Sequence, residues 1–204
     1  MKNTNKLLLI VLSLLQFIAI PGAHGIQINS KNELLIDSRG DDGDIYLCRL
    51  WLSKDIPDYS VKISAFGETQ WNFKTSEWEK LTAGLEAGRS LSKYLHVSQS
   101  LQAINGQMLD YMCFNPGNDS IETTSKISLN MPLCKTLFKE RLGLRLFEEY
   151  TFNLEENQAG LNELGAEITY RLAANASMAI GWHHSDRIHS FDSDYASSSL
   201  NLNF

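Results

Sequence analysis

The last third of the chain alternates apolar and polar residues almost without interruption, in four successive segments of residues 141–204. A period of two residues is the pattern of a β-strand whose two faces meet different surroundings. Glu148 is the one interruption that we identify in the first segment. The residues on the mainly apolar face of the four segments, with Ser198 a polar one among them, are Leu142, Leu144, Leu146, Tyr150, Phe152, Leu154, Leu164, Ala166, Ile168, Tyr170, Leu172, Met178, Ile180, Trp182, Ala196, Ser198, Leu200, Leu202 and Phe204.

The same alternation predicts further strands earlier in the chain. They lie near residues 60–65, 80–88, 95–103 and 126–133. Residues 45–52 form another strand, but two sets of apolar residues, one odd and one even, compete there for the same face. Adding residues 26–36 gives ten strands, an even number, which a chain with both ends on one side of a membrane requires. Eight strands are the alternative, if the first two lie outside the wall.

The connections between the predicted strands fall into two alternating classes. Those expected to be short are residues 54–57, 90–93, 135–140 and 173–176. Those expected to be longer and more polar are residues 69–77, 115–123, 155–160 and 186–193. Short periplasmic turns that alternate with longer extracellular loops are typical of an up-and-down transmembrane barrel.

Residues 1–25 have the pattern of a cleaved secretory signal peptide. Two lysines precede an apolar run of about fourteen residues, which is shorter than the roughly twenty needed to span a bilayer. We expect cleavage after Gly25, which leaves residues 26–204 as one barrel domain. This domain carries sixteen Lys and Arg against twenty-four Asp and Glu, a net charge of about −8. Such a negative charge argues against nucleic acid as a partner.

The signal peptide, the repeated amphipathic strands and the aromatic last residue, Phe204, together resemble a bacterial outer-membrane β-barrel protein. The resemblance implies an all-β fold, an antiparallel up-and-down transmembrane β-barrel. It also implies that Phe204 is the signal read by the barrel assembly machinery, and that outer-membrane lipids and lipopolysaccharide surround the protein. Aromatic residues near strand ends, among them Trp51 and Tyr195, fit the interfacial girdles of such barrels. A soluble periplasmic β domain is a further alternative, since its strands also alternate.

The polar faces of the later strands carry both signs of charge. We therefore place Arg145, Glu149, Glu163, Glu167 and Arg171 in the barrel interior, where opposite charges on adjacent strands stabilise one another. Ten strands leave little free bore, because side chains already fill a barrel of eight. We favour a filled interior over a narrow pore. The predicted function is that of a structural, small-pore or surface-loop interaction protein, without proven catalysis.

One short segment has residues suited to catalysis. His183 and Ser185, placed just before the last strand, resemble the His-x-Ser pair of the outer-membrane lipid A deacylase family. The resemblance implies that Ser185 is the nucleophile, that His183 is the base and that Asp194 orients the imidazole. A lipid A deacylase, a serine hydrolase, is therefore the alternative function. By the alternation, however, His183 and Ser185 are on the polar face, whereas Asp194 is on the same face as Phe204. A β-bulge would be needed to bring Asp194 to the polar face.

The same segment contains a possible set of metal ligands. His184, Asp186, His189 and Asp192 offer imidazole and carboxylate donors, but their spacing matches no motif that forces such ligands together. We predict no metal site and no cofactor.

Three cysteines remain after the signal peptide, Cys48, Cys113 and Cys134. An oxidising compartment permits one disulfide among them and leaves one thiol. Because Cys113 and Cys134 are expected at opposite rims of the barrel, on the order of 30 Å apart, we disfavour a bond between them.

Overall fold

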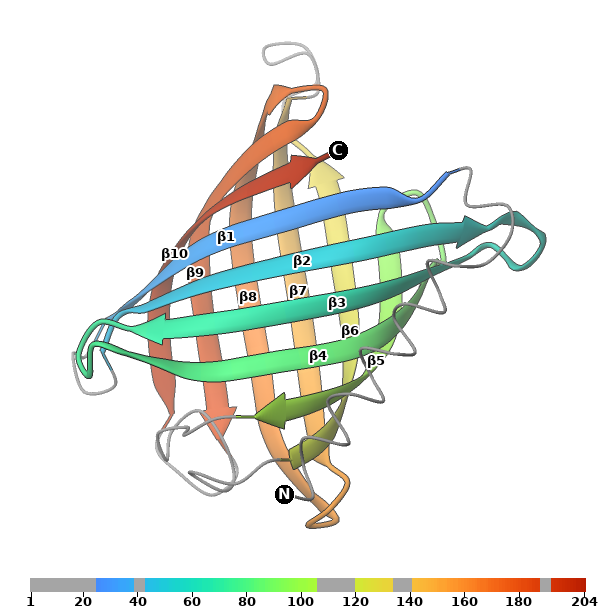
Figure 1. Cartoon of the computed structure of the whole chain (residues 1–204). Coiled ribbons are helices and arrows are strands. Elements are labelled where there is room, and N and C mark those ends of the chain that lie inside the picture. The colour runs from blue at the N-terminus through green and yellow to red at the C-terminus, as the bar shows by residue number, and fades with distance from the viewer. Residues whose placement is uncertain (1–24, 39–42, 106–119, 134–140, 188–191) are drawn as a thin grey trace.

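The chain folds as one closed antiparallel β-barrel of ten strands (Figure 1). The computed structural model describes residues 25–38, 43–105, 120–133, 141–187 and 192–204. The strands are β1 (Gln27–Asp37), β2 (Ile45–Ile56), β3 (Val61–Asn72), β4 (Glu77–Ser90), β5 (Leu95–Asn105), β6 (Ser120–Pro132), β7 (Leu142–Asn153), β8 (Gln158–Ala173), β9 (Ala176–Arg187) and β10 (Ser193–Asn203). The prediction of ten strands in an up-and-down barrel is confirmed.

Each strand pairs with its neighbours in sequence, and β1 pairs with β10 to close the barrel. The closing pair runs from Asn29 opposite Asn203 to Asp37 opposite Tyr195. A short 3-10 helix, η1 (Pro57–Tyr59), connects β2 to β3. In the described part of the chain no helix is both long and apolar enough to cross a bilayer.

The barrel is apolar outside and polar inside, the reverse of a soluble domain. Large apolar side chains exposed on the strands are Ile28, Ile36, Leu50, Leu81, Leu85, Leu101, Ile127, Leu146, Tyr150, Leu164, Ile168, Leu172, Met178, Ile180, Trp182 and Leu200. Buried side chains on the opposite faces include many serines, glutamates and amides. Since a soluble domain would bury its apolar face, the alternative of a soluble periplasmic domain is wrong.

The structure shows which residues of β2 face inward, a point that the alternation left open. Odd-numbered residues of β2, among them Ile45 and Leu47, face inward, and even-numbered residues face outward. Trp51 therefore lines the interior, as does Tyr195, which is 3% exposed. Neither ring belongs to an outer aromatic girdle, so that interpretation is wrong for both. Phe147 also faces inward, which makes it a second interruption of the alternation in β7.

Two of the connections expected to be long are tight turns. Residues 73–76 connect β3 to β4, and residues 154–157 connect β7 to β8. Asn72 stabilises the first turn, because its side-chain oxygen accepts hydrogen bonds from the backbone of Lys74 (2.8 Å) and Thr75 (3.4 Å). Asn153 stabilises the second turn in the same way. The polar residues at the ends of these strands face the interior of the barrel. Residue type alone does not distinguish such strand positions from loop positions.

Some predictions concern residues outside the described ranges. The predicted signal peptide up to residue 24, the cysteines Cys113 and Cys134, and His189 all lie there. Cys48 is described, and it is a free cysteine on the outward face of β2.

The facing of the wall can be tested on adjacent residues of β9. Ile180 is 54% exposed on the outside, whereas Ala179 is 3% exposed and faces inward. In a background without Cys48, Cys113 and Cys134, we expect Ile180→Cys to react several-fold faster with a membrane-soluble maleimide than Ala179→Cys. Faster labelling at position 179 would mean that the strand is shifted by one residue.

Candidate functional site

The barrel encloses a cavity of about 600 Å³. Its lining runs along the full height of the strands. Asn29, Ser53 and Asn201 lie toward the chain termini, and Gln70 and Ser185 lie toward the opposite rim. The expectation of a filled interior is therefore wrong. Many inward positions are serine or glycine, and these small side chains leave space that larger residues would fill.

Charged side chains of both signs line this cavity in equal number. The six basic residues are Lys31, Arg49, Lys62, Lys80, Lys126 and Arg145. The six acidic residues are Glu33, Glu68, Glu86, Glu122, Glu149 and Glu163. Most of these charges belong to contacts between adjacent strands. The cavity lining is therefore strongly polar and balanced in formal charge, and the buried Glu167 adds one further negative charge to the interior.

One group of these residues, the first cluster, consists of Arg49, Phe66 and Glu68. Arg49 on β2 lies directly opposite Glu68 on β3 and binds its carboxylate. The guanidinium also lies over the ring of Phe66, with its central carbon 5.2 Å from the ring centroid. Lys80 approaches the same carboxylate, at 3.7 Å. A carboxylate only 2% exposed thus has two cations beside it, which offsets much of its cost of burial.

The second cluster, Lys126, Phe147 and Glu149, repeats the first on the opposite side of the barrel (Figure 1). Lys126 on β6 lies directly opposite Glu149 on β7 and binds it, and the ammonium nitrogen is 4.5 Å from the centroid of Phe147. The phenylalanine and the glutamate are separated by one residue in both clusters, and each strand ends at the asparagine that stabilises the following turn. The two halves of the wall therefore share one local design.

Each phenylalanine lies over a glycine of the next strand. A Cβ at Gly84 would lie 2.6 Å from the ring of Phe66, and a Cβ at Gly165 would overlap the ring of Phe147. Each glycine follows its phenylalanine at the same sequence separation. A residue without a side chain is needed at both positions, because it lets the ring lie flat against the wall beneath the cation.

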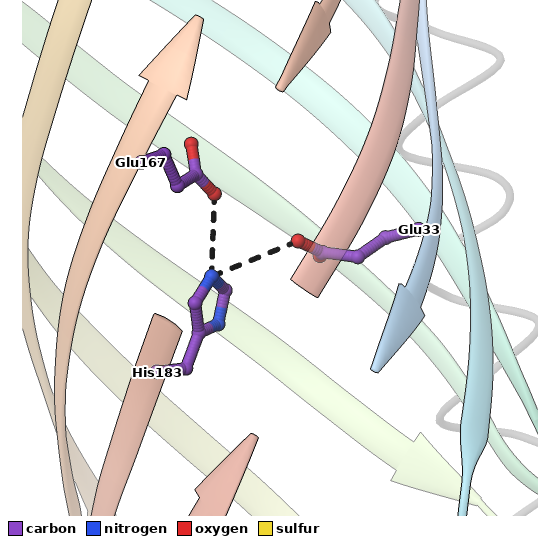
Figure 2. Close-up of side chains that lie close together, drawn as sticks. All are labelled: Glu33, Glu167 and His183. Atoms are coloured by element: carbon purple, nitrogen blue, oxygen red, sulfur yellow. Dashed lines mark hydrogen bonds and ion pairs between the residues drawn. The ribbon is translucent and has the colours of Figure 1, made fainter. Parts of the chain in front are cut away.

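A third group, the histidine cluster, lies near the closing pair of strands and consists of Glu33, Glu163, Glu167 and His183, of which Figure 2 shows all but Glu163. His183 Nδ1 is 3.0 Å from Glu163 Oε1, and Nε2 is 3.3 Å from Glu167 Oε1 and 3.8 Å from Glu33 Oε1. Figure 2 shows the Glu33 and Glu167 carboxylates turned toward the same imidazole nitrogen. Glu33, Glu167 and His183 are each less than 5% exposed.

The residues of the catalytic hypothesis are not brought together as a triad. His183 and Ser185 both face the interior, but the imidazole contacts glutamates through both ring nitrogens. Asp194 is directly opposite His184, and its carboxylate is 3.0 Å from that imidazole. His184 is on the outward face of β9, with its ring stacked on Trp182. The acid and the predicted base therefore lie on opposite sides of the wall.

The five residues predicted for the interior have different positions. Arg145, Glu149 and Glu163 line the cavity. Glu167 is buried in the histidine cluster, with its Oε2 3.3 Å from Arg145 Nε. Arg171 is exposed near the end of β8 and does not line the cavity.

Sequence reasoning did not single out several interior residues that take part in these contacts, among them Glu33, Arg49, Phe66, Glu68, Lys126 and Phe147. Arg49 was missed because the sequence left open which residues of its strand face inward. Glu33 was missed because its strand was added mainly to make the number of strands even. Phe66 and Phe147 are aromatic residues on a polar face, where alternation gives no signal for them. The one signal available was that phenylalanine, glutamate, asparagine and glycine recur in this order and at equal spacings in the two halves of the barrel.

The closed ten-stranded barrel, its apolar exterior and its charged interior define a transmembrane β-barrel of the bacterial outer membrane. The chain matches no family model and no curated protein.

Among solved structures, the chain is similar to the KdgM porin in complex with disordered oligogalacturonate, at 9% identity and a TM-score of 0.46, covering 87% of this chain and 99% of that one. It is also similar to the NanC porin, at 7% identity and a TM-score of 0.45, again covering 87% and 99%. The β-barrel domain of Pseudomonas aeruginosa OprF gives 9% identity and a TM-score of 0.33, covering 88% and 96%. These similarities are weak, and the class of this protein follows from its own wall and interior.

The contact between ring and glycine can be tested at Gly84. We expect Gly84→Ala to lower the free energy of unfolding by about 1–3 kcal/mol, because the added methyl group would lie 2.6 Å from the Phe66 ring and 2.7 Å from the Leu101 carbonyl oxygen. Gly67→Ala is the matched control, since nothing lies closer than 4.0 Å to its added Cβ. Urea titration in detergent measures both. Equal stability of the two variants would show that the ring is free to move.

Proposed function

We propose that this protein is a narrow outer-membrane channel for small hydrophilic solutes. The observation that carries the proposal is the cavity of about 600 Å³, whose lining runs from one end of the strands to the other. A space of this size corresponds to roughly twenty water molecules. It suits solutes of a few heavy atoms, or ions with part of their hydration shell, rather than large substrates.

The lining charges support weak charge selectivity. Basic and acidic side chains occur in equal number, and in the two clusters each cation lies opposite a glutamate. Paired charges present a dipole rather than a net field to a passing solute. Channels that prefer one sign of ion instead carry rings of one kind of charge. Neutral and zwitterionic solutes are therefore the class that this interior fits best.

Planar-bilayer recording of the purified barrel tests the channel. We expect a small conductance and, under a KCl gradient, a reversal potential near zero, because the lining is balanced in charge. A protein that folds in detergent but gives no conductance, and that does not admit small sugars into liposomes, would contradict the proposal.

Charge removal from the first cluster gives a sharper test. Glu68→Gln leaves Arg49 without its partner, so we expect a shift toward anion selectivity, whereas Arg49→Gln should shift selectivity toward cations. The matched control is Glu148→Gln, which removes the same charge from the outward face of β7. Its reversal potential should equal that of the wild type. Shifts of the same sign for both interior variants would mean that solutes do not pass this cluster.

We also propose that Phe204 is the assembly signal of the barrel. Its backbone continues the pairing of β10 with β1, since its amide donates to the carbonyl of Ile28 at 2.7 Å, and its side chain is 72% exposed. An exposed aromatic ring at this point is available to the barrel assembly machinery. The rest of the apolar exterior is available to outer-membrane lipids and lipopolysaccharide.

We expect Phe204→Asp to reduce the amount of heat-modifiable protein in the outer membrane several-fold. Phe73→Asp makes the same chemical change at the opposite end of the barrel, where Phe73 is also exposed, and should leave that amount nearly unchanged. Normal accumulation of the Phe204 variant in the outer membrane would show that Phe204 is not the assembly signal.

A further inference from the structure

The histidine cluster has the geometry of a metal centre. We propose that Glu33, Glu167 and His183 bind one divalent first-row transition ion, for which Zn²⁺ is the test ion. The inference goes beyond the channel and does not depend on it, because it concerns how three strands are held together.

Three donor atoms converge on one point in the barrel (Figure 2). They are His183 Nε2 and one carboxylate oxygen each of Glu33 and Glu167, and all three lie within 4.8 Å of one another. The two donor separations that involve His183 Nε2 are 3.3 Å and 3.8 Å. Ligands around a tetrahedral zinc ion with bonds near 2.0–2.1 Å lie about 3.3 Å apart. An inward movement of Glu33 that brings its Oε1 to this separation from both other donors would complete a three-ligand site.

An unsatisfied oxygen supports the assignment independently of the cluster's composition. Glu33 is 4% exposed, and its Oε1 atom, which faces His183, has no hydrogen-bond partner among the described residues. A buried carboxylate oxygen without a partner is costly, so such an atom calls for an explanation. Coordination of a cation between Glu33 and His183 would satisfy it.

Two of the three ligands, His183 and Glu33, have a close outer partner of the kind that orients metal ligands. His183 Nδ1 is 3.0 Å from Glu163 Oε1, so an N–H at Nδ1 donates to this carboxylate and leaves the lone pair of Nε2 facing the ion. Lys31 Nζ is 2.6 Å from Glu33 Oε2 and 3.9 Å from Glu167 Oε1. Arg145 Nε is 3.3 Å from Glu167 Oε2, an ion pair without a hydrogen bond. The short Lys31 contact therefore orients Glu33 and leaves its Oε1 facing His183.

The charge and space around the cluster agree with a bound cation. Three glutamates and two basic side chains leave one net negative charge beside a neutral imidazole, and a divalent ion fits this environment. Gly181 leaves the space for Glu167, since a Cβ there would lie 2.8 Å from Glu167 Cγ. Glu33 and His183 also line the cavity, so water can occupy a fourth coordination position.

A bound ion would join strands that are not adjacent. Glu33 is on β1, Glu167 on β8 and His183 on β9, while β10 lies between β1 and β9. The ion would therefore cross-link the closure of the barrel from the inside. Its expected effect is a folded barrel that resists heat more when loaded than when metal-free.

The test uses the full-length mature barrel without an affinity tag, purified in detergent. We expect equilibrium dialysis to give one zinc ion per chain, and zinc to raise the temperature at which the barrel loses its heat-modifiable form. Cobalt in place of zinc should give the visible absorption bands of a four-coordinate site.

Three variants decide whether these residues are the ligands. His183→Gln and Glu33→Gln should abolish the stoichiometric binding and the thermal shift. Glu163→Gln should keep the site but weaken it about 10–100-fold, because only the outer partner of the imidazole is changed. Glu68→Gln, which removes a buried carboxylate of the first cluster, is the matched control and should bind zinc as the wild type does.

Two outcomes would overturn the proposal. One is zinc binding that survives both His183→Gln and Glu33→Gln, which would place the ion elsewhere. The other is a folded wild-type barrel that retains no zinc and shows no thermal shift. In that case hydrogen bonds from both ring N–H groups of a protonated His183 to the glutamates would hold the cluster together in place of an ion.

Discussion

The hydrogen-bonded closure of β1 on β10 is the constraint on which the rest of this structure depends. In the hydrocarbon of a bilayer, each unpaired backbone group costs several kcal/mol, so a spanning sheet can have no free edge. Nine residue pairs join the two strands, from Asn29 with Asn203 to Asp37 with Tyr195. Once the sheet is closed, one face of every strand must meet lipid and the other must meet the interior, and this sets the alternation of the whole sequence.

The interior of the barrel poses a second problem, because its charged side chains are enclosed by a wall of low dielectric constant. An isolated charge there would be strongly destabilising, whereas a charge with a close partner on the next strand is tolerated. The first and second clusters solve this in the same way, with a cation opposite a glutamate and above a phenylalanine ring. The aromatic face adds a favourable cation–π contact and shields the pair from one side.

The sequence predicts the architecture better than the site, for a physical reason. Facing in a strand repeats every two residues, so alternation alone assigns Ile168 and Ile180 to lipid. Together with the need for an even number of strands, it also gives ten, with eight as the alternative. Contacts inside the barrel depend on register between strands, which is set by bulges and turns such as those at Asn72 and Asn153. Pattern reasoning therefore grouped His183 with Ser185 on one strand. The structure instead gives it partners from β1 and β8.

The place of Glu33 in the histidine cluster has a consequence for the order of events during folding. Glu33 is on the first strand, whereas Glu167 and His183 are on the eighth and ninth, yet all three meet in one small volume. Contacts between residues so distant along the chain carry a high loop-closure entropy and form late. Glu167 and His183 are on adjacent strands and can pair before closure, whereas Glu33 reaches them only when β1 has closed on β10. The contacts that β1 makes in this cluster, Glu33 with His183 and Lys31 with Glu167, exist only in a chain whose sheet has closed into a ring.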